Sequence, residues 1–293
     1  MMAKWDDAQA RKLLGLSSVA APVPSTMSSD INIADAKKWV YYLSALEFQG
    51  RSTGSAEEKV YTKALADAFK SWGLQGGAPD GGFFETFEFT SGVGLGSNNS
   101  LEVVGSYKNK YTVSKDFEPL SFSKVGEFRE APIVFAGYGI KAPASDKEPA
   151  YDSYKGLEVK GKWVLIFNDL PENVEPQRRQ YLNLYSRLQH KITVAKNEGA
   201  VGILVTNGIL SDVPEKFGSV KFEGALSENS LAVLRLSTDA AAALVKYAYK
   251  DLGILQRDLD KGEMVEGFVI PSAYMKAKVD LEFKKAKIGR AHV

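Results

Sequence analysis

The residue types that carry most protein chemistry are scarce in this chain. Its 293 residues include two histidines, His190 and His292, and no cysteine. A metal centre needs several imidazole, thiolate or carboxylate ligands that converge on the ion. The acidic pairs Asp6-Asp7 and Glu57-Glu58 lie in no histidine or glycine framework that would complete such a site. The sequence therefore indicates no catalytic residue, no metal ligand and no cofactor held by this chain, and it leaves the substrate-binding residues unknown.

Two other catalytic patterns are incomplete. Ser186 is the serine nearest to His190, but no acid stands in a partner position and no Gly-x-Ser-x-Gly turn occurs. The glycine-rich segment 92–97 lacks the glycine spacing and the lysine of a nucleotide-binding loop. A flexible hairpin loop is the favoured interpretation of that segment, and phosphate binding is the alternative.

Basic residues give three further candidates, each with a structural alternative. Arg51, between two expected helices, could bind a substrate carboxylate, but anchoring of helix-end carbonyls is favoured. His190 is expected to be a partly exposed helix histidine rather than a catalytic or metal-binding one. Arg178-Arg179, Arg187 and Lys191 form an expected basic helix face, solvated by default, with docking on an acidic protein surface as the alternative.

Composition narrows the class of protein. The chain is 44% hydrophobic and 25% charged, which is typical of a soluble protein of about two domains. With 37 basic and 36 acidic residues, the net charge of +1 gives no electrostatic case for nucleic acid as a partner. No apolar run has the length of a membrane span, and the polar start contains no signal peptide. The oligomeric state cannot be read from the sequence.

The first third of the chain predicts a flexible lead-in, two helices and two strands. Residues 1–30 contain Pro- and Ser-rich turns. Asn32 is expected to cap a helix that runs to Leu46, and the capping box that begins at Ser55 opens a second helix that Gly73 ends. Segments 83–89 and 101–107 then read as a β-hairpin or as neighbouring strands.

The remainder predicts α/β layering. Segments 133–136, 163–167, 201–205 and 231–236 are short, apolar and β-rich, as buried strands are. One long helix is expected from Tyr181 to Gly199, and another from Ala240 to Leu252 with Ser237 or Thr238 as its cap. The predicted class is α/β.

Four blocks, read in order, resemble one protein family. They are LEFQGRSTGS at 46–55, FAGYGIKAP at 135–143, YDSYKGLEVKGK at 151–162 and KITVAKNEGAVGIL at 191–204. Together they resemble the N-terminal part of the di-zinc aminopeptidases that carry an inserted protease-associated (PA) domain. Gly137 and Gly139 are expected to turn the chain with positive φ, and Asp152 and Tyr154 to form an Asx-turn or a tyrosine hydrogen bond.

The resemblance implies a domain plan. Residues 31–107 would be the N-terminal part of a truncated peptidase domain, with its helices and edge strands. Residues 108–274 would be the inserted PA domain, of α+β or β-rich type, and residues 275–287 a strand that returns to the peptidase domain. The last six residues, 288–293, match one reading frame of a widely used sequencing adapter, so we expect them to be foreign; an ordinary basic tail is the alternative.

The resemblance also implies an activity for a longer parent protein. That parent would be a zinc metallopeptidase with two zinc ions, an aminopeptidase or exopeptidase whose PA domain shapes the access of peptide substrates. The chain as given would be an inactive fragment without the metal-binding part. The family resemblance favours a periplasmic or secreted location, with the cytoplasm as the alternative. A stand-alone, non-catalytic PA-type module that binds peptides or proteins is the second hypothesis.

Overall fold

The computed structural model describes residues 30, 32–45, 48, 50–218, 220, 230–262 and 265–291, with the backbone alone for Thr86 and residues 286–291. Residues 1–29 of the expected lead-in and His292 lie outside the described residues. The chain divides into two compact units. Unit 1 comprises Met1–Ser91 with Lys284–Val293, and unit 2 comprises Gly92–Phe283. Each is considered separately below.

Unit 1 contains the two helices that the capping patterns predict. Helix α2 spans Ile33–Leu43, and its cap Asn32 accepts a hydrogen bond from the backbone of Asp35. Helix α3 spans Ala56–Ser71, its cap Ser55 accepts from the backbone of Glu58, and Gly73 follows its end with φ 78°. The capping predictions are confirmed, whereas the expected apolar stripe of α2 is only partly buried, because Ala36 and Val40 are exposed.

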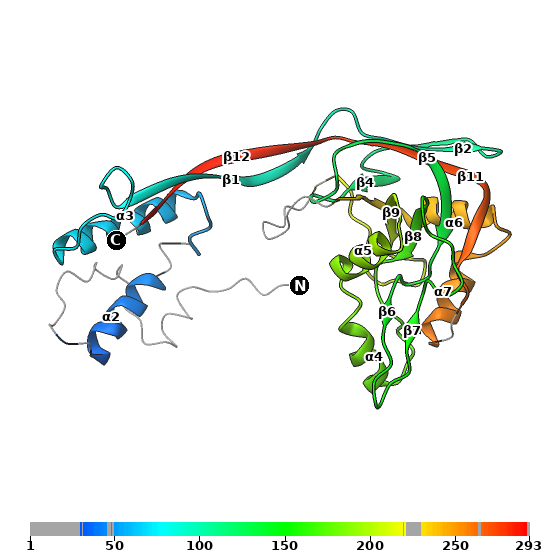
Figure 1. Cartoon of the computed structure of the whole chain (residues 1–293), viewed down its shortest axis with the longest axis horizontal. Coiled ribbons are helices and arrows are strands. Elements are labelled where there is room, and N and C mark those ends of the chain that lie inside the picture. Colours follow the sequence, from blue (N-terminus) through cyan, green and yellow to red (C-terminus); the bar gives the residue numbers. More distant parts are fainter. Residues whose placement is uncertain are drawn as a thin grey trace. The chain divides into compact units, whose positions relative to one another are not determined.

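A two-stranded ribbon connects unit 1 with the ends of unit 2. Strand β1 (Phe84–Leu95) pairs with β12 (Leu281–Ala291), as Figure 1 shows. The expected hairpin between segments 83–89 and 101–107 is wrong, because β1 takes β12 as its partner. Four residues of the predicted flexible loop, 92–95, are part of β1, where Val93 is buried. Strand β12 also runs through 288–291, since backbone pairing does not depend on which side chains a strand carries.

Unit 2 is built on one mixed sheet of eight described strands, in the spatial order β3-β2-β11-β5-β8-β9-β10-β4. Neighbours β5, β8, β9 and β10 are parallel, and the remaining pairings are antiparallel. The strands are β2 (Ser100–Gly105), β3 (Asn109–Tyr111), β4 (Phe117–Pro119), β5 (Gly126–Phe135), β8 (Trp163–Phe167), β9 (Gly202–Thr206), β10 (Ala232–Leu236) and β11 (Phe268–Val279). The four buried strands predicted from apolar runs are all present.

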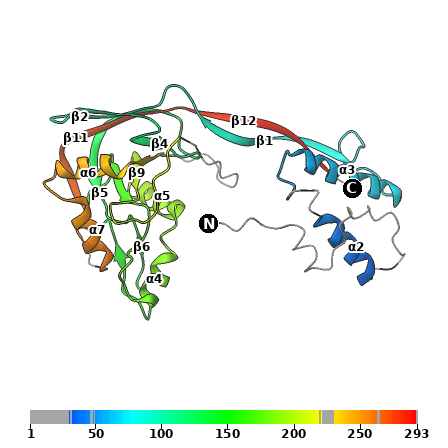
Figure 2. The same cartoon turned by 180° about the vertical axis from the view of Figure 1, so that it is seen from behind.

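Helices cover both faces of the sheet. Helix α5 (Leu188–Asn197) packs on one face, and α6 (Thr238–Lys246) and α7 (Leu252–Asp260) pack on the other (Figures 1 and 2). Successive residues of β8 alternate between the two cores, with Val164 on the α5 side and Leu165 on the α6 and α7 side. Burial on both faces explains why this strand is a continuous apolar run. The α/β class is confirmed.

Two expected long helices are each divided. Helix α4 (Pro176–Asn183) ends before Leu184, which is 68% exposed, and α5 begins only at Leu188. Helix α4 contacts the segment 143–149, whereas α5 packs on the sheet. A single straight helix could not make both of these contacts. The helix expected over 240–252 ends at Lys246, because Tyr249 takes φ 54° and α7 starts at Leu252 behind its cap Asp251.

Unit 2, residues Gly92–Phe283, extends beyond the predicted insertion of residues 108–274 at both ends. Strands β2 and β3 lie on either side of the predicted start, and β11 crosses the predicted end. Because β11 pairs with both β2 and β5, the sheet cannot be divided at either position. Two short strands, β6 (Lys141–Ala142) and β7 (Tyr151–Asp152), pair outside the main sheet.

The contact between Gly202 and Trp163 makes the packing of the central strands testable. These residues are register partners in β9 and β8, and a Cβ on Gly202 would overlap the buried indole ring. We expect Gly202→Ala to lower the free energy of unfolding by about 1–3 kcal/mol. Gly94→Ala is the matched strand control, because no atom lies within 4 Å of its added Cβ. Equal urea midpoints for both variants by circular dichroism would contradict this packing.

Candidate functional site

The carboxyl ends of the parallel strands of unit 2 gather buried polar groups. Ligand sites of α/β proteins lie at this edge of the sheet, because loops and helix N-termini meet there. In unit 2 the edge carries the turn after β5, the segment 168–173 after β8 and the first turns of α5. The side chain of Lys191 and a pair formed by Tyr138 and Asp260 lie here.

Lys191 is fully buried at the end of β8. Its Nζ donates hydrogen bonds to the carbonyl oxygens of Phe167 at 3.0 Å and Asn168 at 2.7 Å, and to that of Asp169. It also lies 5.8 Å from the ring centroid of Tyr138. An ammonium group has three N–H donors and no acceptor, so three carbonyls satisfy it completely. The lysine thereby ties α5 to the backbone that leaves the central strand.

Burial shifts the proton affinity of this group and of its neighbours. Desolvation lowers the pKa of Lys191 to about 7, and the Asp169 carboxylate opposes that shift. Desolvation also raises the pKa of Asp169, partly offset by Lys191. The pKa of the Tyr138 hydroxyl is raised, first by burial and then by its hydrogen bond to Asp260. A buried amine near neutrality is a possible proton acceptor, but here it is enclosed by its three carbonyls.

The predicted solvated basic face is therefore wrong for Lys191. Arg178 and Arg179 form ion pairs, with Glu148 at 3.4 Å and with Glu172 at 3.3 Å. Of the four residues, Arg179 and Arg187 are exposed, and Arg187 has no ion-pair partner among the described residues. Sequence reasoning missed Lys191 because a helix lysine is usually solvated. A signal was present, since Lys191 lies three residues after Leu188 and four before Ala195, on the face that docks.

His190 and Ser186 are not assembled into a catalytic pair. The His190 ring is half-buried and makes an edge contact with Tyr185 at 5.5 Å. Its buried Nε2 has no hydrogen-bond partner among the described residues. The Ser186 hydroxyl donates to the carbonyl of Asn183. The expectation of a partly exposed helix histidine is confirmed.

The structural alternative for Arg51 is also confirmed. Its Nη1 donates to the carbonyl of Leu43, the last residue of α2. The guanidinium carbon lies 4.5 Å from the ring centroid of Tyr61 in α3. Arg51 thus satisfies a carbonyl at the end of α2 and packs on the next helix, so its place in unit 1 is explained without a substrate.

The turn residues of the family blocks have the expected local roles. Gly137 and Gly139 have φ of 50° and 64°, as predicted. A Cβ on Gly139 would lie 2.9 Å from the side chain of Ile166, so space as well as φ favours glycine. The backbone N–H of Tyr154 donates to Asp152 Oδ1 at 2.9 Å, which forms the expected Asx-turn.

A metal ion in a protein is held by several converging imidazole, thiolate or carboxylate ligands. No group of three or more His, Asp or Glu side chains converges among the residues that the structure describes. No helix of these residues is long and apolar enough to cross a membrane.

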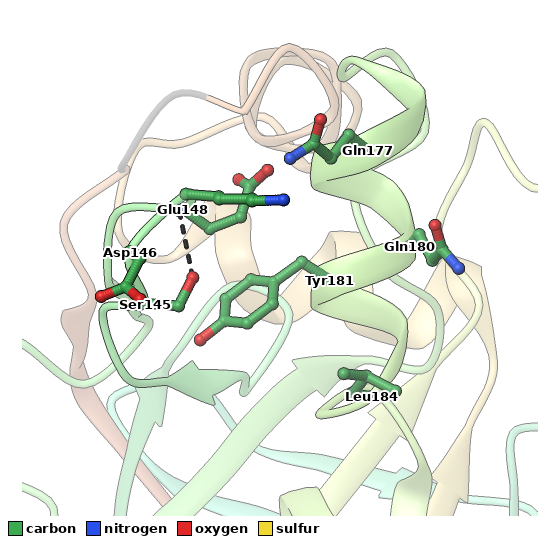
Figure 3. A pocket seen from close by; sticks show the side chains of 8 residues that line it. Ser145, Asp146, Glu148, Gln177, Gln180, Tyr181 and Leu184 are labelled. Carbon is green, nitrogen blue, oxygen red and sulfur yellow. Dashed lines mark hydrogen bonds between the residues drawn. The ribbon is translucent and has the colours of Figure 1, made fainter.

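A surface pocket of about 430 Å³ lies beside α4 in unit 2. Figure 3 shows Tyr181 projecting from α4 toward the loop that carries Ser145 and Glu148, while Gln180 points to the other side of the helix. The Tyr181 hydroxyl donates to the carbonyl of Pro143, and Ser145 Oγ accepts from the backbone of Glu148 at 3.1 Å. The lining offers amide, hydroxyl and carboxylate groups, which suit hydrogen bonding to polar ligands. It contains no nucleophile paired with a base.

Comparison with known proteins gives a distant structural likeness. No family model and no curated protein matches the chain. A solved structure of BSAP, a zinc aminopeptidase from Bacillus subtilis, matches with a TM-score of 0.34 and 14% identity over 80% of this chain. A second, medium-resolution structure of BSAP matches with a TM-score of 0.34 and 16% identity, also over 80% of this chain. The chain spans 40% of the length of each.

The buried lysine predicts a pH-dependent stability. Because the folded pKa of about 7 lies below the ordinary value of 10.5, the unfolded chain binds more protons between these pH values. The free energy of unfolding should therefore rise with pH across that window, by at most about 1.4 kcal/mol per pH unit. Urea unfolding of wild type and Lys191→Met at pH 7 to 10 measures this contribution as their difference.

Lys196→Met is the control on the same helix, because Lys196 is exposed. Its unfolding free energy should follow that of the wild type at every pH. Parallel pH profiles for wild type and Lys191→Met would show that Lys191 does not change its protonation on unfolding.

Proposed function

We propose that the chain is the N-terminal part of a zinc-dependent aminopeptidase or related exopeptidase. In this proposal unit 1 belongs to the peptidase domain, and unit 2 is an inserted PA-type domain that shapes the access of peptides. The zinc ions of such an enzyme would activate a water molecule for attack on the peptide bond. The described residues of this chain would supply the scaffold and the access domain.

The discontinuity of unit 1 is the observation that carries the proposal. One compact unit is formed by residues from both sides of unit 2, and β1 and β12, which lead into and out of unit 2, are hydrogen-bonded neighbours. The backbone N–H of Gly96 donates to the carbonyl of Asp280, and Ser91 Oγ donates to that of Lys284. This is the connectivity that an inserted domain requires, and it is independent of the BSAP likeness.

Exposed apolar side chains on α2 and α3 support the same proposal. Ile33 is 75% exposed, and Val40 and Val60 are each 61% exposed. The amphipathic helices of a domain normally turn such residues toward a core. A further layer of the peptidase domain would bury them.

The test is to clone the gene beyond codon 287 and to compare the longer protein with the present chain. With zinc supplied, we expect the longer protein to hydrolyse an aminoacyl anilide, and a chelator to abolish the activity. The present chain should not hydrolyse it under either condition. A stop codon directly after Lys287 in the natural gene, or a longer, zinc-loaded protein that is inactive on N-terminally free peptides, would reject the proposal.

A stand-alone PA-type binding module is the second candidate, and the pocket of Figure 3 favours it. In that case the present chain should bind peptides without any further sequence. Titration of the chain with a pool of short peptides distinguishes the candidates, since Tyr181→Ala should weaken such binding while Tyr249→Ala, at a residue 92% exposed and outside the pocket, should not.

A further inference from the structure

A second cavity of unit 2 has no role in the proposed function. Its volume is about 460 Å³, and it lies on the α5 side of the sheet, close to the carboxyl ends of β8 and β10. Its walls come from five parts of unit 2: residues 118–122 in and after β4, Asn168 after β8, residues 187–189 at the start of α5, Val220, and Arg235 of β10. The pocket of Figure 3 shares none of these residues.

The N-terminus of α5 opens into this cavity without a side-chain cap. Arg187 occupies the cap position and makes no capping hydrogen bond. Its carbonyl accepts from the backbone of His190 and Lys191, but no acceptor among the described residues meets the N–H groups of Leu188 and Gln189. Free N–H groups and the helix dipole place partial positive charge at this end.

Ser121 provides an independent sign that the cavity takes a polar ligand. The residue lines the cavity and is only 8% exposed, yet its hydroxyl has no hydrogen-bond partner in the part of the chain that the structure describes. The nearby Ser123 is also buried, and its hydroxyl accepts from the backbone of Val233 at 2.9 Å. The Ser121 hydroxyl, unpaired among the described residues, lines the cavity, so it is available to donate to a polar group that occupies it.

The charges around the cavity favour an anion. Arg187 is exposed and has no ion-pair partner among the described residues, and Arg235 uses Nη1 on the carbonyl of Lys216, which leaves its other N–H donors available. Glu118 is the one carboxylate in the lining, and it is held by the backbone N–H of Gly218. Lys191 Nζ donates to the carbonyl of Asn168 in the cavity wall and adds positive charge when it is protonated.

We propose that this cavity binds an oxyanion, the carboxylate or phosphate group of a small molecule. The N–H groups of Leu188 and Gln189 and the Ser121 hydroxyl would donate to its oxygens, and Arg187 and Arg235 would balance its charge. Helix N-termini with arginine support are suited to this chemistry. The proposal does not depend on the peptidase assignment, because all of these residues belong to unit 2.

The experiment is a titration of the full chain with sodium phosphate and with sodium acetate, at constant ionic strength held with chloride, followed by amide chemical shifts. Saturable shifts that centre on Leu188 and Gln189 are expected for at least one of the anions. Tighter phosphate binding would identify a tetrahedral ligand group, and tighter acetate binding a carboxylate. Both results support the site.

Variants separate this site from general charge attraction. Arg187→Gln should weaken binding about tenfold, since a charge-assisted hydrogen bond is lost. Arg187 is exposed, so this variant should fold normally. Ser121→Ala should also weaken binding, and Arg179→Gln on α4, outside the cavity, should leave it unchanged. Shifts that do not saturate with either anion, or an equal loss in Arg179→Gln, would overturn the proposal.

Discussion

The burial of one ammonium group constrains the carboxyl edge of the unit 2 sheet. Lys191 is fully buried, so its three N–H donors need acceptors from the protein. The chain at the end of β8 presents the carbonyls of residues 167, 168 and 169 to them. That requirement fixes the path of the backbone after β8. Farther along the same segment, the N–H of Glu172 reaches Asp260 Oδ1, the acceptor that Tyr138 also uses. The turn after β5, the segment after β8 and the end of α7 are therefore held by linked polar contacts.

The contacts of Lys191 explain why buried polar groups lie between the two apolar cores of unit 2. Each face of the sheet is covered by helices, so the strand ends could not remain solvated at the edge where α5 and α7 approach. Carbonyls left unpaired there would each cost about 1–3 kcal/mol. The lysine removes that cost for three carbonyls at once, and its own desolvation appears as the lowered pKa. The side chain is thus part of the packing of α5 and no part of a solvated surface.

Helices and strands could be predicted from the sequence because their signals are local. The partner of each strand in a sheet was harder to predict. The caps Asn32, Ser55 and Ser237 and the buried runs of β8 and β9 depend on neighbouring residues, so spacing reveals them. The partner of β1 is β12, almost two hundred residues later, and no local pattern encodes that pairing. Spacing alone therefore predicted a hairpin between β1 and the next strand along the chain.

The candidate sites were also hard to predict from the sequence, because burial decides which of their residues are chemically important. Histidines and serines attract attention in a sequence because catalysis uses them, yet His190 and Ser186 have local partners only. Lys191 and Ser121 are ordinary residue types whose importance comes from burial. Asn168 contributes its carbonyl to Lys191 and also lines the cavity at the start of α5. An anion bound in that cavity would lie near the buried ammonium and offset part of its desolvation cost, because Coulomb attraction is stronger where water is excluded. A bound anion and the lysine would therefore be electrostatically coupled, with Asn168 in contact with both the cavity and Lys191.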